Sequence, residues 1–313
     1  MDAVAAEPVG VADPTTGRTR IGTPVDGERV LASLSPSRAS DFRTCPLMYR
    51  LRTIDRLPET PSPDALRGTV VHKVLEDLFD LPALDRTPDR AESMVQDAWD
   101  FVLDAEPEAA TLFTGDGPEI TAWLQTCRES LRAYFTLEDP RRLEPAEREL
   151  YVETLLESRL LLRGFVDRLD IAPDGAIRVV DYKTGRSPGV GFEGKALFQM
   201  RFYALVIWRT RGVVPALLRL VYLGDGQMVS YEPDEDDLRA TERLVEAVWR
   251  AIDTARSTGE FLPQPGWACR WCSFQAYCPE FGGETPPMPE PRSPSGGVGQ
   301  TGQVGQVGEV VDP

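Results

Sequence analysis

Apolar residues recur at helical spacing along the first half of the chain. The clearest stretch predicts a helix over 64–80, where the apolar positions are Val70, Val71, Val74, Leu75, Leu78 and Phe79. Similar spacing predicts helices over 87–105 and 117–137. A shorter helix is predicted to begin at Ser35-Pro36, with the serine as its cap, and to end near Cys45, which Pro46 follows.

The period of the pattern changes near residue 148. Segments rich in Val, Ile and Leu predict three strands, over 148–155, 158–171 and 176–183, and Pro173-Asp174-Gly175 forms the last turn between them. We expect an antiparallel meander. A helix over 193–211, strands over 215–223 and 227–232, and a helix over 235–258 complete the list. This order predicts an α/β fold without the regular strand–helix alternation of a doubly wound sheet.

Both ends of the chain lack hydrophobic periodicity. Residues 1–30 and 284–313 are rich in Pro and Gly, and we expect them to be disordered. The folded body then covers 31–283, with a mainly helical part, a sheet core, and a last helix with a cysteine-rich segment, over 31–140, 145–232 and 233–283. No apolar run approaches the ~20 residues that span a bilayer, and no secretory signal is evident. We therefore expect a cytoplasmic protein with no membrane contact.

The formal net charge of −16 argues against a nucleic-acid partner, because attraction to phosphate supplies much of the affinity for DNA. The charge is unevenly distributed, however. Between Arg38 and Arg56 five Arg residues stand against two Asp residues, around Cys45. Such a patch on an acidic body is compatible with DNA binding, and Arg43 is a candidate contact. A solvated helix face is the alternative interpretation.

Two carboxylates and a lysine occupy neighbouring predicted strands. If the strands pair through the turn at 173–175, Asp167 and Asp181 converge, and paired carboxylates suit a hard cation such as Mg²⁺. Asp181 and Lys183 are two residues apart, so their side chains point to one face of the sheet. The ammonium could orient a water molecule or stabilise charge on a phosphate. An exposed ion pair is the competing explanation of this triplet.

His72 is the one histidine of the chain, and it lies on the helix predicted over 64–80. Its ring is a possible nitrogen ligand, although a histidine on a mostly apolar helix is more often a core residue. Gln199 and Tyr203, four residues apart, share one face of the helix over 193–211. These two residues are compatible with a supporting role at a site or with a half-buried polar stripe.

The cysteines are grouped in a way that indicates metal. Cys269, Cys272 and Cys278 form a C-x2-C-x5-C run, and Cys45 is the candidate fourth ligand. Thiolates select zinc or iron–sulfur clusters, and spacing alone favours zinc. A disulfide framework is not expected in a cytosolic chain. Cys127 is predicted to be a small core residue on an amphipathic helix.

Taken together, these motifs resemble the nuclease module of RecB and AddB and the iron–sulfur nucleases of CRISPR spacer acquisition, all in the PD-(D/E)XK superfamily. The resemblance covers roughly 33–281, and it rests on His72, Gly164-x-x-Asp167-Arg168, Asp181-x-Lys183 and Gln199-x-x-x-Tyr203. It implies a restriction-endonuclease-like core, a mixed central sheet flanked by helices, with an N-terminal helical part and a C-terminal iron–sulfur segment.

The resemblance also implies functional roles. His72, Asp167, Asp181 and the Tyr182 carbonyl would bind Mg²⁺ or Mn²⁺, with Lys183 as the catalytic lysine and Gln199 and Tyr203 in support. Cys45, Cys269, Cys272 and Cys278 would hold a [4Fe–4S] cluster rather than zinc. The expected activity is cleavage of DNA, on single strands or duplex ends, in repair or recombination. No helicase phosphate-binding motif is present, so a helicase would be a separate partner.

Two other functions remain open at this point. One is a DNA-end-binding module without activity, against which the intact His, Asp, Asp and Lys set argues. The other is a zinc-stabilised protein-interaction domain with an acidic body.

Overall fold

The computed structural model describes residues 11–12, 19–21, 30, 32–59, 62–113, 118–189 and 194–289. The described residues form two compact units. The first unit contains 32–36 and 62–246, and the second contains 37–59 and 247–289. Each unit is therefore built from segments that are distant in sequence.

The first unit is organised around a mixed sheet. Its strands are β1 (Val11–Ala12), β2 (Thr19–Ile21), β3 (Ala32–Leu34), β4 (Glu147–Leu155), β5 (Leu160–Ile171), β6 (Ile177–Lys183), β7 (Leu217–Tyr222) and β8 (Gln227–Tyr231). The spatial order is β1-β2-β4-β5-β6-β7-β8, and β3 pairs with β5. Strands β4, β5 and β6 are antiparallel, which confirms the predicted meander. The mixed α/β fold is likewise confirmed.

Strands β6 and β7 are parallel, with Asp181 opposite Leu220. Parallel neighbours need a crossover, and here the crossover contains the helix α7 (Gly194–Arg211). Strand β8 then returns antiparallel to β7. The sheet is therefore mixed because one helix interrupts a series of hairpin-connected strands.

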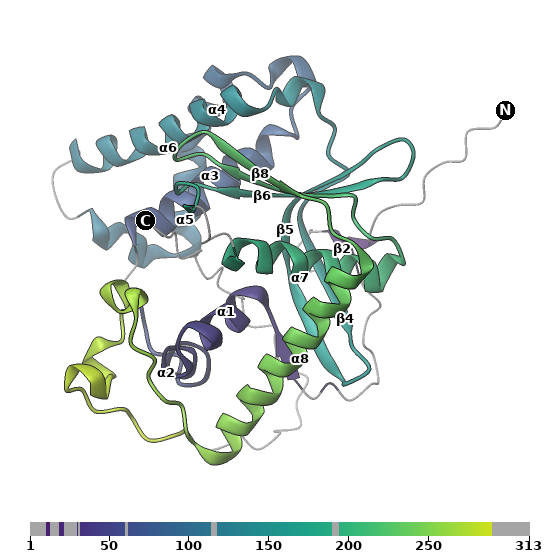
Figure 1. Ribbon diagram of the computed structural model, residues 1–313. Coiled ribbons are helices and arrows are strands. Elements are labelled where there is room, and N and C mark those ends of the chain that lie inside the picture. Colours follow the sequence, from purple (N-terminus) through teal and green to yellow (C-terminus); the bar gives the residue numbers. More distant parts are fainter. Residues whose placement is uncertain are drawn as a thin grey trace. The chain divides into compact units, whose positions relative to one another are not determined.

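Helices cover both faces of this sheet (Figure 1). On one face lie α3 (Pro63–Leu78), α4 (Pro88–Ser93), α5 (Val95–Ala105) and α6 (Pro118–Leu137). Their core includes the β6 side chains Val180 and Tyr182. The helix α7 packs against β4, β5, β6 and β7 from the other face. Because side chains alternate along a strand, Asp181 and Lys183 point toward α7.

The helix expected over 87–105 is two helices, α4 and α5, with Met94 between them. Thr87 caps α4 by accepting a hydrogen bond from the Arg90 amide at 3.3 Å, and Pro88 occupies the first turn. Cys127 on α6 is fully buried, as predicted, and burial raises the pKa of its thiol to about 12.

The second unit joins the segment around Cys45 to the end of the chain. It contains α1 (Pro36–Thr44) from Ser37 onward, α2 (Pro46–Tyr49), the π-helix η1 (Arg50–Ile54) and the second half of α8 (Glu235–Thr258), followed by the short turns η5 (Trp267–Trp271), η6 (Gln275–Tyr277) and η7 (Pro279–Phe281). Tyr49 stacks on Phe261 with ring centroids 6.5 Å apart, and the Arg50 guanidinium donates to the Pro286 carbonyl. The helical stretch after Pro46 was not predicted.

Most of the two predicted tails lies outside the described residues. Within 1–30, however, Val11–Ala12 and Thr19–Ile21 form strands β1 and β2, where the sequence pattern had indicated no regular structure. The reason is pairing with distant residues, since Arg20 lies opposite Tyr151 of β4. No helix in the described ranges is both long and apolar enough to cross a membrane.

Candidate active site

His72, in the middle of α3, lines a small cavity together with Glu76, Glu149, Asp167 and Tyr182. The helix brings it there because Val71, Val74 and Leu75 are buried and fix the rotation of α3. The His72 Nε2 atom lies 2.9 Å from the Tyr182 carbonyl oxygen. The imidazole is 18 % exposed, so it opens toward the cavity and is not a core residue.

Asp167 lies where the β5–β6 ladder ends. The last paired residues are Arg168 and Val180, so Asp167 and Asp181 come next on their strands. Instead of a backbone partner, the Tyr182 amide donates to Asp167 Oδ2 at 2.7 Å. The same oxygen lies 3.5 Å from His72 Nδ1. One carboxylate therefore connects the histidine to the strand that carries the lysine.

Asp181 belongs to a chain of polar contacts on the α7 side of β6. Its Oδ2 lies 2.8 Å from Lys183 Nζ, and Gln199 Nε2 donates to its Oδ1 at 3.1 Å. Lys183 also donates to Gln199 Oε1 at 3.0 Å, and Gln199 Nε2 lies 3.3 Å from the Tyr203 hydroxyl. Asp181 is buried, whereas Lys183 is partly exposed. The motif residues of β6 and α7 thus hold the ammonium group in one place.

Gly164 explains how Tyr203 reaches this chain of contacts. A Cβ atom at Gly164 would lie 2.7 Å from Tyr203 Cε1, closer than real contacts allow. The ring therefore packs directly on the β5 backbone. The glycine of the Gly-x-x-Asp motif is required by close approach rather than by a turn.

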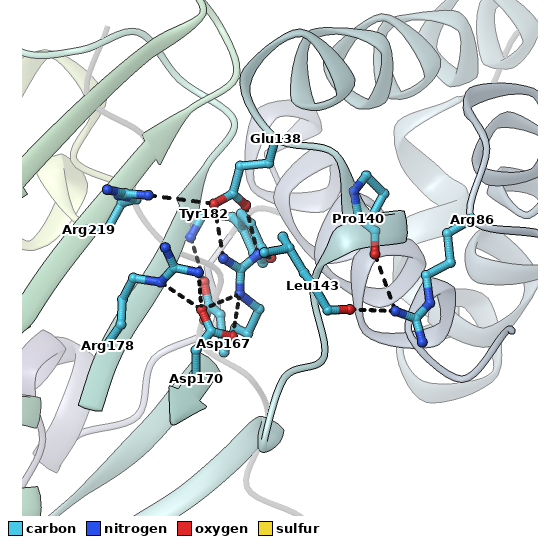
Figure 2. A network of polar contacts seen from close by, with 10 residues as sticks. Arg86, Glu138, Pro140, Leu143, Asp167, Asp170, Arg178, Tyr182 and Arg219 are labelled. Carbon is cyan, nitrogen blue, oxygen red and sulfur yellow. Dashed lines mark hydrogen bonds and ion pairs between the residues drawn. The ribbon is translucent and has the colours of Figure 1, made fainter. Parts of the chain in front are cut away.

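Arg168 supports Tyr182 from beneath the site. The guanidinium is fully buried, donates to the Tyr182 hydroxyl at 2.6 Å, and binds Glu138 at 2.8 and 3.0 Å. Asp170 completes its ion pairs. Figure 2 shows Glu138 and Asp170 on either side of Tyr182, with Arg178 and Arg219 nearby.

These charges shift the titration of the buried groups. Burial alone would raise the pKa of Glu138, but the hydrogen bond and charge of Arg168 outweigh it and lower that pKa below its usual value of 4.5. Burial raises the pKa of the Tyr182 phenol, which therefore keeps its proton. Tyr182 is thus fixed by its side chain as well as by its backbone.

Glu149 is the site residue that the sequence motifs missed. It is buried on β4, and its Oε1 lies 3.9 Å from His72 Nδ1. Ligand atoms of His72, Glu149 and Asp167 all lie within 4.8 Å of one another, so these three residues could hold a metal ion. Asp181, expected as a ligand, is not in this group and instead contacts Lys183 and Gln199. No motif spacing marks Glu149, although an acidic residue inside a predicted strand is a weak signal.

The donor set fits a hard divalent cation. Adjacent ligands of an octahedral Mg²⁺ ion are about 3 Å apart, given metal–oxygen distances of about 2.1 Å. The 2.9 Å between His72 Nε2 and the Tyr182 carbonyl oxygen agrees with that spacing. Two carboxylates at one edge would supply the negative charge.

The four cysteines of the predicted cluster line one pocket in the second unit. Cys45, Cys269, Cys272 and Cys278 share this pocket with apolar residues such as Leu47, Met48 and Phe274. Backbone amides point at the sulfurs: Met48 and Gln264 donate to Cys45 Sγ at 3.5 and 3.4 Å, and Gly266 donates to Cys269 Sγ at 3.4 Å. Such N–H···S contacts accompany thiolate ligands in metal clusters. We refer to this as the cysteine pocket.

The arginine patch around Cys45 is only partly available for a ligand. Arg50 is buried and pairs with Asp55 at 3.1 Å, and Arg52 binds Asp41 and Glu59. Both arginines therefore stabilise the second unit. Arg43 is exposed and remains the candidate contact.

Comparison with known proteins gives a consistent family. Residues 33–279 match the PD-(D/E)XK nuclease superfamily. The Gene 69 protein of Mycobacterium phage D29 is 26% identical, over 79% of this chain and 96% of that protein. The Gene 69 protein of Mycobacterium phage L5 is 24% identical, over 82% and 99%.

Two further similarities are more distant. Half of this chain (50%) is 29% identical to 14% of a polypeptide of the ATP-dependent helicase/deoxyribonuclease of Streptococcus mutans serotype c. A solved structure from Eubacterium rectale, provisionally described as an exonuclease, shares the fold with a TM-score of 0.50 and 15% identity, over 80% of this chain and 93% of that one. Because the superfamily match covers most of the sequence, from β3 to η7, this chain belongs to the PD-(D/E)XK nuclease superfamily.

Proposed function

We propose that this nuclease is a metal-dependent exonuclease that degrades single-stranded DNA or DNA ends in repair or recombination. The observation that carries the proposal is the convergence of His72, Asp167 and the Tyr182 carbonyl on one cavity, next to the strand that holds Lys183. The deoxyribonuclease and exonuclease descriptions of two similar proteins support the substrate and the mode of attack.

The residues of the site divide the work. His72, Asp167 and the Tyr182 carbonyl would hold Mg²⁺ or Mn²⁺, with Asp181 as a further ligand by resemblance to RecB and AddB. A divalent cation bound there would supply a Lewis acid that draws charge from the scissile phosphate. The Lys183 ammonium, positioned by Asp181 and Gln199, would neutralise charge that builds on the phosphate as water adds to phosphorus and one ester bond breaks.

The cysteine pocket belongs to the same proposal. We expect a [4Fe–4S] cluster bound by Cys45, Cys269, Cys272 and Cys278, with zinc as the alternative. The amides that point at Cys45 and Cys269 support thiolate ligands at this pocket. A cytoplasmic location agrees with cysteines kept reduced for metal binding. A helicase, where strands must be opened, would be a separate chain.

The test is cleavage by anaerobically purified full-length protein. Linear single-stranded DNA labelled at the 5′ or 3′ end should be degraded with Mn²⁺ or Mg²⁺ and left intact with EDTA. A circular single strand should survive, because an exonuclease needs an end. Lys183→Ala and Asp181→Asn should lower the rate by at least 100-fold.

Lys73→Ala is the matched control for the lysine, since Lys73 pairs with Glu76 and Asp77 on the surface of α3. Cleavage of the circle at the linear rate would make the enzyme an endonuclease. Wild-type rates in Lys183→Ala, with contaminating nucleases excluded, would refute the active site.

A further inference from the structure

Glu149 has a backbone conformation that its neighbours on β4 do not share. Its φ angle is 44°, in the left-handed region that favours glycine. Residues on both sides are regularly paired, Arg148 with Arg168 and Leu150 with Val166. Glu149 therefore lies opposite Asp167 at a point where β4 is locally distorted. Such strain in a non-glycine residue persists only where the surroundings impose it.

The surroundings hold β4 against α3 at this point. Arg148 donates to the Glu76 carbonyl at 2.8 Å and pairs with Asp80 at 2.7 Å. Glu76 is one helical turn from His72. Further along the chain, Arg86 donates to the carbonyls of Pro140 and Leu143, just before β4 begins (Figure 2). The strand therefore cannot slide to relieve the distortion.

The result is a second carboxylate beside the histidine. Glu149 Oε1 and Asp167 Oδ2 lie 3.9 and 3.5 Å from His72 Nδ1, and their side chains are only 9 % and 12 % exposed. Two like charges in a poorly solvated cavity repel each other. On the other side of the ring the Tyr182 carbonyl offers another acceptor, so the cavity gathers oxygen atoms around one space.

We infer that Glu149 is a metal ligand of this nuclease, in addition to the motif residues, and that its strained backbone exists to place the carboxylate. The inference rests on the proposed metal-dependent function. A cation at this position relieves the repulsion between Glu149 and Asp167. Asp181 contacts Lys183 and Gln199, so the carboxylate charge closest to His72 comes from β4 and β5 rather than from β6.

Calorimetric titration of Mn²⁺ into tag-free, metal-stripped full-length protein tests this assignment without using activity. Glu149→Gln, which keeps the shape and removes the charge, should weaken Mn²⁺ binding at least tenfold, as should Asp167→Asn. Glu153→Gln is the matched control, because Glu153 is also buried on β4 but bonds Tyr151. Its Mn²⁺ affinity should equal that of the wild type.

Glu149→Asn serves if the glutamine variant does not fold, since asparagine tolerates the left-handed conformation. It too should lose the Mn²⁺ affinity, and Mn²⁺ should no longer raise its melting temperature. Unchanged Mn²⁺ affinity in both Glu149 variants, together with a loss in Asp167→Asn, would overturn the role of Glu149 and leave the proposed site intact. Unchanged affinity in Asp167→Asn would overturn the proposed site itself.

Discussion

Gly164 and Tyr203 are separated by most of the sheet core in sequence, yet the ring of one lies on the backbone of the other. The contact lets the Tyr203 hydroxyl reach Gln199, which in turn holds Lys183 and Asp181. A residue without a side chain thus sets the position of the catalytic lysine.

Gly164→Ala should therefore displace Tyr203. Overpacking of this kind costs about 1–3 kcal/mol, which corresponds to a fall in melting temperature of roughly 2–12 °C in a protein of this size. Nuclease activity should fall as well. In Gly68→Ala, by contrast, the new Cβ meets Thr184 Oγ1 at an ordinary 3.7 Å, and alanine is the better helix former. Equal melting temperatures for the two variants would contradict this explanation.

Sequence motifs predicted several of these residues and missed others for a physical reason. His72, Asp167 and Tyr182 are brought together in the structure as the resemblance implied. Glu149 escaped because what distinguishes it is a backbone angle, set by Arg148 and by pairing with β5, that no spacing encodes. Arg168 was recognised as part of a motif, but its role beneath Tyr182 depends on Glu138, thirty residues earlier.

The end of α6 is joined to strands β5 and β6 by the Arg168 network. Glu138 follows the last residue of α6, Arg168 belongs to β5, and Tyr182 belongs to β6. Because Arg168 is fully buried, removal of one partner leaves a charge that water cannot reach. The network therefore fixes the helical layer to the two strands that carry the site.

Glu138→Gln should destabilise the protein by about 3 kcal/mol at neutral pH. The folded-state pKa of Glu138 is lowered, so its contribution to stability is present above its unfolded value of 4.5 and is lost as the pH falls through the folded value. The gap in melting temperature between wild type and variant should accordingly narrow as the pH is lowered from 7 to below 4.5. A gap that is constant with pH would show that Glu138 acts through shape alone.

Hydrophobic periodicity predicted α3, α6, α7, α8 and the meander to within a few residues. It missed the helical stretch of α2 and η1, because Pro46 was interpreted as an end when it occupies the first turn of the next helix. It also gave no sign that β6 and β7 are parallel, since pairing direction depends on where α7 packs. Local patterns define elements, whereas pairing depends on contacts distant in sequence.

The cysteine pocket draws on two segments at opposite ends of the folded body, both in the second unit. If the four thiols bind one cluster, the link closes a loop of more than two hundred residues. By analogy with a disulfide, closure of such a loop contributes roughly 4–5 kcal/mol.

Replacing Cys45, Cys269, Cys272 or Cys278 with Ser should remove iron and the brown absorption to a similar extent and lower the melting temperature by a similar amount. Cys127→Ser is the control, with a cost of roughly 1 kcal/mol for a hydroxyl in an apolar core and no loss of iron. Iron content and visible spectra after anaerobic purification decide the matter. If Cys45→Ser retains full iron, the fourth ligand lies elsewhere, and a colourless wild-type protein containing zinc would replace the iron–sulfur cluster by zinc.

The discontinuity of the second unit has a consequence for biosynthesis. Cys45 leaves the ribosome long before Cys278, and at about 5–20 residues per second the intervening chain takes roughly 10–50 s to make. During that time the ribosome-bound chain displays α1 and α2 without the segment that completes their pocket. Metal loading is therefore confined to chains that have been translated almost to the end, and a prematurely terminated chain would carry a lone thiol that no cluster can occupy.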